Sequence, residues 1–130
     1  MFLCDTNVVS EFFRPRPSQK LLDWAEGVSE IFVSVVTIEE IQFGLSWRPK
    51  PRILGALESF LSERCKLLPI TPEIANRSGV MRGSFQARGQ TRSVQDMLIA
   101  ATAEIHQLVL VTRNVDDFAE CALTLFNPID

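Results

Sequence analysis

The chain has 130 residues, with 13 lysines and arginines against 16 aspartates and glutamates, and its formal net charge is −3. Hydrophobic residues make up 46% and charged residues 22%, which excludes a disordered tail or a collagen-like repeat. One domain over residues 1–130 is expected, with a core that needs no disulfide or metal. A mildly acidic chain argues at first sight against a nucleic-acid partner, because phosphate binding favours basic residues.

Several classes of protein are also excluded by simple patterns. Apolar runs fall far short of the ~18 residues of a membrane-spanning helix. The first residues lack the basic region of a secretory signal, so we expect a cytoplasmic protein. The widely spaced Cys4, Cys65 and Cys121 indicate reduced thiols. His106 is the one histidine and falls late in a predicted helix. With a single histidine and widely spaced cysteines, the chain cannot form the usual Cys/His zinc site.

The first half of the chain alternates short apolar strands with helical patterns. Strands are predicted over residues 2–4 and 31–33. Ser18 is a good helix N-cap and Gly27 a good stop, and Thr37 is read as the start of another helix. The predicted helices cover 7–13, 18–27, 37–45 and 52–63.

The second half continues the alternation. Strands are predicted over 67–70, 108–111 and 123–126, and Pro69 favours a strand edge. Helices begin at Thr71–Pro72, running towards Gly89 with weak points at Gly79 and Gly83, and at Ser93, ending at His106. Strands separated by helices predict a mostly parallel sheet of four to five strands, covered on both faces as an α/β/α sandwich. The ligand site of such a sheet lies at the carboxyl ends of its strands.

Asp5 and Glu40 are the first two candidate acids. Asp5 directly follows the first strand, although it also suits the N-cap of the next helix. Glu40 fits a capping box with Thr37, a purely structural role. Glu39 shares a polar face with Gln42 and Ser46, whereas Glu40 lies on the side of Gly44, so Glu40 is favoured as the inward-facing acid.

Asp96 and the segment 112–118 complete the candidates. Asp96 also fits a capping box, with Ser93, and Ala100 and Ala103 follow on its face; these small residues leave space beside the carboxylate or serve close helix packing. In the segment, Asn114, Asp116 and Asp117 follow a strand, and the two aspartates also suit a helix start.

Acids that converge on one cleft repel each other, and a cation relieves that cost. An oxygen-only cluster suits Mg²⁺ or Mn²⁺, and two such ions serve phosphodiester hydrolysis.

Four segments together resemble one known family. Asp5-Thr6-Asn7, Thr37 to Gly44, Asp96 to Ala103 and Val111 to Phe118 are similar, in order, to the motifs of PIN-domain proteins, and most of all to VapC-type toxins of toxin–antitoxin pairs, including the FitB type. The resemblance implies a PIN-like α/β/α sandwich and Mg²⁺-dependent ribonuclease activity, with Mn²⁺ as the other candidate ion.

The resemblance also implies partners and site residues. It implies a homodimer and a cognate antitoxin that blocks the site, with DNA contacted only through the antitoxin. Asp5, Glu40 and Asp96 match the family's metal-binding acids. The fourth position stays open between Asn114 and acids such as Asp117.

An acid-free stretch from Ile74 to Gln95 is the first candidate RNA-binding surface, through Arg77, Arg82, Arg88 and Arg92. Arg48, Lys50 and Arg52 form a second basic cluster, and Arg14, Arg16 and Lys20 a third. With Asp5, Glu40, Asp96 and Asp117 set aside as metal-facing, 12 acids remain against 13 bases, so the net charge no longer opposes an RNA substrate.

Two other functions are compatible with parts of the pattern. One is a phosphohydrolase that uses Asp5 as a covalent nucleophile, although Asn7 stands where a second aspartate is expected. The other is a catalytically inactive PIN fold that binds RNA or a protein partner, against which the three intact acids argue.

Overall fold

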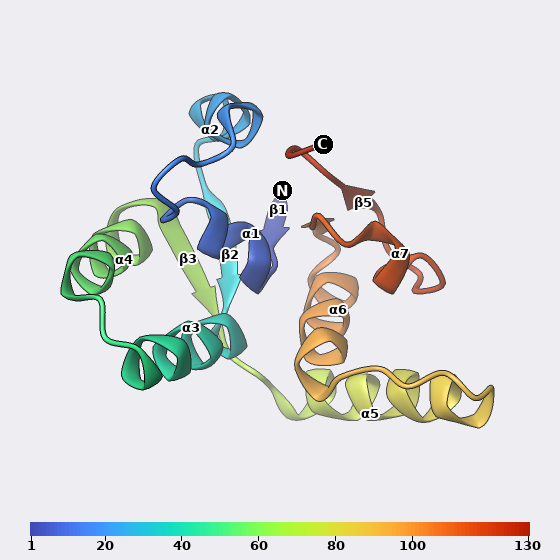
Figure 1. Cartoon of the computed structure of the whole chain (residues 1–130). Helices are drawn as coiled ribbons and strands as arrows, with labels where there is room; N and C mark the ends of the chain where they lie inside the picture. Colours follow the sequence, from blue (N-terminus) through green and yellow to red (C-terminus); the bar gives the residue numbers. More distant parts are fainter.

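A single sheet of five parallel strands forms the centre of the computed structural model, which describes all 130 residues. The strand order is β3-β2-β1-β4-β5, so the first strand lies in the middle (Figure 1). Cys4 of β1 pairs with Val33 on one side and Val111 on the other. The parallel α/β prediction is confirmed, and β3 lies at an edge as Pro69 indicated. The strands are β1 (Phe2–Cys4), β2 (Ile31–Ser34), β3 (Cys65–Leu68), β4 (Val109–Val111) and β5 (Leu125–Phe126).

Seven helices connect and flank these strands, and several begin where the sequence predicts. Ser18, Thr71 and Ser93 are N-caps whose hydroxyls accept a backbone N–H from the first turn. The helices are α1 (Thr6–Glu11), α2 (Gln19–Glu26), α3 (Val35–Trp47), α4 (Pro51–Arg64), α5 (Pro72–Ala87), α6 (Val94–His106) and α7 (Val115–Phe118).

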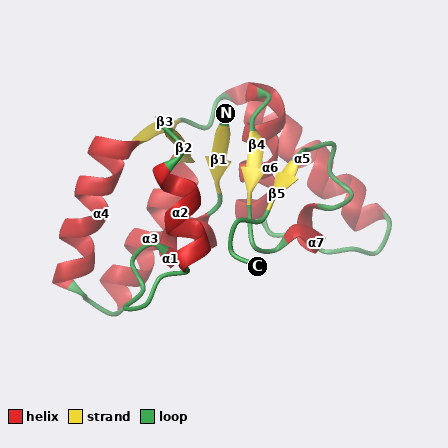
Figure 2. Ribbon diagram, turned by 90° about the horizontal axis from the view of Figure 1, so that it is seen from above, coloured by secondary structure: helices red, strands yellow, loops and turns green.

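Each face of the sheet has its own apolar core, because successive strand residues point to opposite sides. Leu3 and Leu110 pack against α5 and α6, whereas Cys4 and Val111 pack against α1, α2 and α4. Figure 2 shows α5 and α6 on one side of the strands and α2 and α4 on the other. The three-layer sandwich is therefore confirmed. Ala100 and Ala103, predicted either to leave space or to pack, are fully buried in the first core.

Several predicted boundaries are wrong, among them the strands expected over 67–70 and 123–126, which are β3 (Cys65–Leu68) and β5 (Leu125–Phe126). The helix expected from Thr37 begins at Val35, because Ser34 at the strand end accepts the Val36 N–H and caps it first. Thr37 is thus fully buried inside the helix, and no capping box with Glu40 forms. The first helix ends at Glu11 rather than residue 13. Helix α5 runs unbroken through Gly79 and Gly83, since Ile74, Met81 and Phe85 anchor its length in the core.

No helix combines the length and the apolarity that a membrane span requires. All three cysteines are free thiols, as predicted.

Candidate active site

Asp5 lies at the carboxyl end of the central strand and is only 4% exposed. Its Oδ1 accepts the Val8 N–H at 2.9 Å, so it is also the N-cap of α1, and the Thr112 hydroxyl donates to the same carboxylate. Burial raises the pKa of Asp5; these two hydrogen bonds oppose the rise, and the charges of Asp96 and Glu40 add to it. The N-cap interpretation of Asp5 is therefore confirmed, and its role in a metal site stays a prediction.

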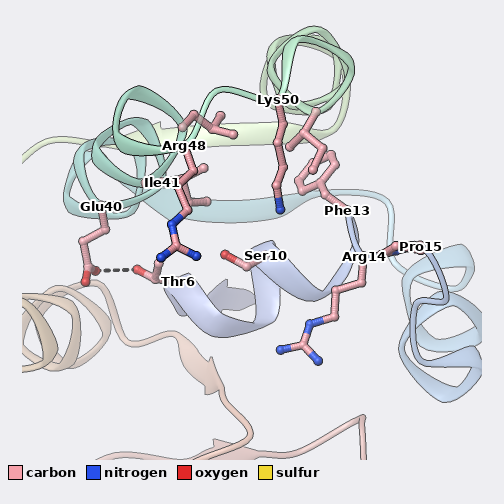
Figure 3. A pocket seen from close by; sticks show the side chains of 12 residues that line it. Thr6, Ser10, Phe13, Arg14, Pro15, Glu40, Ile41, Arg48 and Lys50 are labelled. Atoms are coloured by element: carbon pink, nitrogen blue, oxygen red, sulfur yellow. Dashed lines mark hydrogen bonds between the residues drawn. The ribbon is translucent and has the colours of Figure 1, made fainter.

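Glu40 reaches the same edge of the sheet from α3. The Thr6 hydroxyl donates to Glu40 Oε1 at 2.6 Å (Figure 3). The same hydroxyl lies 2.9 Å from the Thr37 hydroxyl. Glu40 is half-buried whereas Glu39 is exposed, so the preference for Glu40 as the inward-facing acid is confirmed. The role of Thr6 was not predicted. The one feature of the sequence that could have indicated it is a hydroxyl residue directly after Asp5.

Asp96 enters from the first turn of α6. Its backbone N–H donates to Ser93 Oγ at 3.0 Å, which holds the start of the helix. Burial raises the pKa of Asp96, the Ser93 hydroxyl lowers it, Asp117 raises it further and Arg92 lowers it. Asp117, in the first turn of α7, is thus the acid of segment 112–118 whose charge acts on Asp96.

Asn114 accepts the Asp117 N–H through its backbone carbonyl at 3.1 Å, but its side chain is not among the groups that shift the pKa of Asp5 or Asp96. It occupies the N-cap position of α7, yet its side chain makes no capping hydrogen bond, and it lines a separate polar notch. Asp116 is exposed in the same first turn. The expected position of the two aspartates at a helix start is confirmed.

The four acids Asp5, Glu40, Asp96 and Asp117 have no cationic partner, since none takes part in an ion pair of the structure. Burial raises the pKa values of Asp5 and Asp96, and the charges of neighbouring acids add to the rise. Only oxygen donors are offered, which fits a hard divalent cation such as Mg²⁺ or Mn²⁺. No three of the chain's Asp, Glu, His or Cys side chains are close enough to form a ligand set for one ion. The four acids therefore fit such a cation by the chemistry of their oxygen donors and by their charge. Their side chains would have to move closer together to bind one ion.

A cleft of about 380 Å³ opens beside Glu40, between α1, α3 and α4. Its apolar wall includes Phe13, Ile41 and Ile53. In Figure 3 the side chains of Arg48 and Lys50 extend from the α3–α4 region towards α1. Two members of the second basic cluster and Arg14 of the third therefore lie next to a candidate acid.

The arginines of the 74–95 stretch are more divided. Arg77 Nε binds Glu104 Oε2 at 2.9 Å, and Arg88 lies 3.7 Å from Glu120, so these two charges are locally offset. Arg82 is exposed. Arg92 stacks on the Phe85 ring at 4.6 Å and lowers the pKa of Asp96, so it is the arginine of this block that acts on the acid cluster. Their role in RNA binding stays a prediction.

The fold and the site together define a parallel α/β domain with a candidate acidic site beside the carboxyl end of its central strand. The PIN domain family model matches residues 2–122, so the chain belongs to the PIN-domain family.

Within that family the chain is similar to bacterial toxins. It is 27% identical to Toxin FitB of Neisseria gonorrhoeae, covering 98% of both chains. It is 30% identical to Ribonuclease VapC10 of Mycobacterium tuberculosis over 91% of this chain and 86% of that protein. Among solved structures, a toxin–antitoxin complex from Klebsiella pneumoniae contains a chain 27% identical to this one, with a TM-score of 0.74 and 98% of both chains covered.

Proposed function

We propose that this chain is a Mg²⁺- or Mn²⁺-dependent endoribonuclease and the toxin of a toxin–antitoxin pair. The observation that carries the proposal is the set of four acids at one sheet edge without cationic partners. Membership of the PIN family and similarity to Ribonuclease VapC10 and Toxin FitB support it.

Asp5, Glu40, Asp96 and Asp117 would hold the cation, whose chemistry is to activate water and to stabilise the leaving oxygen of a phosphodiester. Thr6 directs the Glu40 carboxylate, and Thr112 and Val8 fix that of Asp5. The cations of the cleft, together with Arg92, would bind RNA phosphates.

The proposed partners are a cognate antitoxin, a second copy of the chain in a homodimer, and DNA only through the antitoxin. Similarity to a chain of a toxin–antitoxin complex supports the antitoxin. Light scattering with and without the co-expressed antitoxin measures both associations.

The phosphohydrolase alternative is less compatible with the geometry. A covalent nucleophile needs an accessible carboxylate, but Asp5 is 4% exposed and accepts hydrogen bonds from Val8 and Thr112. The alternative of a catalytically inactive fold does not explain why four acids lie here without ion-pair partners.

The test is RNA cleavage by the chain freed of antitoxin, with Mg²⁺, with Mn²⁺ and with chelator. We expect Asp5→Asn, Glu40→Gln and Asp96→Asn each to lower cleavage by more than about 100-fold, since groups outside the first coordination shell already cost about 10–100-fold. Glu39→Gln is the matched control, because Glu39 neighbours Glu40 in α3 and is exposed.

Thermal unfolding accompanies each assay. Saturating Mn²⁺ is expected to raise the stability of the wild-type chain, by about 2.7 kcal/mol at a hundredfold excess over Kd, and not that of Asp96→Asn. Equal cleavage by Glu40→Gln and Glu39→Gln would remove Glu40 from the site. Cleavage that persists fully in chelator would refute the metal dependence.

A further inference from the structure

A second hollow, here called the polar notch, lies along the same helix as the Glu40 cleft. It has a volume of about 230 Å³ and is lined by Asn7, Ser10, Glu11, Arg14, Arg113 and Asn114, with Ile129 as its one apolar residue. Ser10 of α1 and Arg14, three residues after the end of α1, line both hollows.

Two short stretches of backbone connect the wall of the notch to Asp5 and to its neighbour Thr112. Asn7 is two residues beyond Asp5 in α1, and Asn114 is two residues beyond Thr112, whose hydroxyl bonds the Asp5 carboxylate. The Asn114 N–H donates back to Thr112 Oγ1 at 3.0 Å, which ties the notch wall to the same hydroxyl. None of the four acids lines the notch itself, but these two links bring its wall beside Asp5, so a ligand there would lie near a phosphate held at the proposed cation.

The notch offers two side-chain amides and two guanidinium groups. Asn7 and Asn114 are both exposed, and Asn114 occupies a helix N-cap position without using its side chain as the cap. An amide presents donors and an acceptor side by side, which matches the edge of a nucleobase.

Arg14 and Arg113 lie 3.3 Å from Glu11 and 3.5 Å from Asp130, and their side chains are 65% and 47% exposed. Each charge is thus partly offset by its acid, as those of Arg77 and Arg88 are, but such exposed pairs are weak, so a phosphate can compete for the guanidinium N–H groups.

We propose that the polar notch binds the RNA nucleotide adjacent to the cleaved phosphodiester, with Asn7 and Asn114 contacting its base and Arg14 and Arg113 its phosphate. This rests on the proposed ribonuclease function. A protein partner fits the notch poorly, because a docked helix or strand requires apolar walls and these lie in the Glu40 cleft instead. Asn114 is thereby assigned to the substrate rather than to the cation, for which Asp117 is the better placed fourth residue.

The first measurement is RNA binding in chelator, where cleavage is stopped, using fluorescence anisotropy with a labelled single-stranded RNA pool. We expect Asn7→Ala and Asn114→Ala each to weaken binding by about 10-fold, the scale of one amide–base contact. Gln107→Ala, which removes an exposed amide at the end of α6 away from Asp96, is the control and is expected to bind as the wild type does.

The second measurement separates a base contact from a metal ligand. Asn114→Asp is expected to weaken RNA binding and to leave Mn²⁺ affinity unchanged in calorimetry; tighter Mn²⁺ binding would make position 114 a metal ligand and overturn the proposal. Sequencing of products from a randomised RNA is expected to show an altered base preference next to the cut in Asn7→Ala and Asn114→Ala.

The outcomes distinguish the two proposals. A wild-type chain that binds RNA but never cuts it refutes the ribonuclease, while weaker binding by both alanine variants would still support the notch. Cleavage by the wild type, with both variants indistinguishable from Gln107→Ala, overturns the notch alone. Weaker binding of the antitoxin, without any effect on RNA, would make the notch a protein contact and overturn it too.

Discussion

Thr6→Val removes one hydroxyl while keeping the size and branching of the side chain. In the structure that hydroxyl donates to Glu40 Oε1 at 2.6 Å and contacts the Thr37 hydroxyl at 2.9 Å, across 31 to 34 residues of sequence. The substitution therefore breaks a link between α1 and α3 and leaves the fully buried Thr37 without this partner.

The expected loss of stability follows from the kind of bond. A hydrogen bond to a charged group contributes about 1.5–3 kcal/mol, and because Thr6 and Glu40 are only half-buried we take the lower part of that range. For a chain of this size the corresponding decrease in Tm is about 4–8 °C. Thr6→Ser keeps the hydroxyl and is expected to recover most of the loss.

The assay is a double-mutant cycle by chemical denaturation in chelator, with Thr6→Val, Glu40→Ala and the double variant. We expect a coupling free energy of about 1 kcal/mol or more, as for side chains in direct contact. Additive losses, or equal stabilities of Thr6→Val and Thr6→Ser, would refute the argument that the hydroxyl holds Glu40.

Two further changes test how the acids are held. Ser93→Ala removes the acceptor of the Asp96 N–H and is expected to lower stability by about 1 kcal/mol and to weaken Mn²⁺ binding, measured by denaturation and calorimetry; unchanged Mn²⁺ affinity would show that the cap does not position Asp96. The raised pKa of Asp5 means that the folded chain binds a proton more tightly than the unfolded chain, so in chelator stability decreases as pH rises from the ordinary Asp value of 3.8 towards the raised folded value. Asp5→Asn keeps a cap acceptor for Val8 and is expected to flatten this decrease in unfolding curves collected from about pH 4 to about pH 7; an unaltered slope would show that Asp5 does not cause it.

The element order was predictable because it depends on local signals. The apolar strands around Leu3, Val33 and Leu110 and the caps Ser18, Thr71 and Ser93 each act within a few residues of sequence. The α3 start was misplaced for the same reason: two residues, Ser34 and Thr37, are both good caps, and only the end of β2 selects Ser34.

The candidate site was partly predictable. The choice of Glu40 over Glu39 follows from helix periodicity, and the helix start at Asp116 and Asp117 from residue preference. The bond from Thr6 to Glu40 was not, because sequence spacing carries no information on which two hydroxyl and acid residues meet across the sheet edge. The pairing of Arg77 with Glu104, 27 residues away, could not be predicted for the same reason. The number of unpaired positive charges in the acid-free stretch was therefore overestimated.

Three of the four acids stand at the beginnings of helices: Asp5 caps α1, and Asp96 and Asp117 lie in the first turns of α6 and α7. The partial positive charge of a helix N-terminus stabilises a carboxylate there, and an asparagine at a cap is accepted almost equally well. An aspartate-to-asparagine change needs one nucleotide and leaves such a scaffold standing. In the proposed role of a toxin, a single nucleotide change can therefore inactivate the enzyme. The product is expected still to fold and to bind its antitoxin.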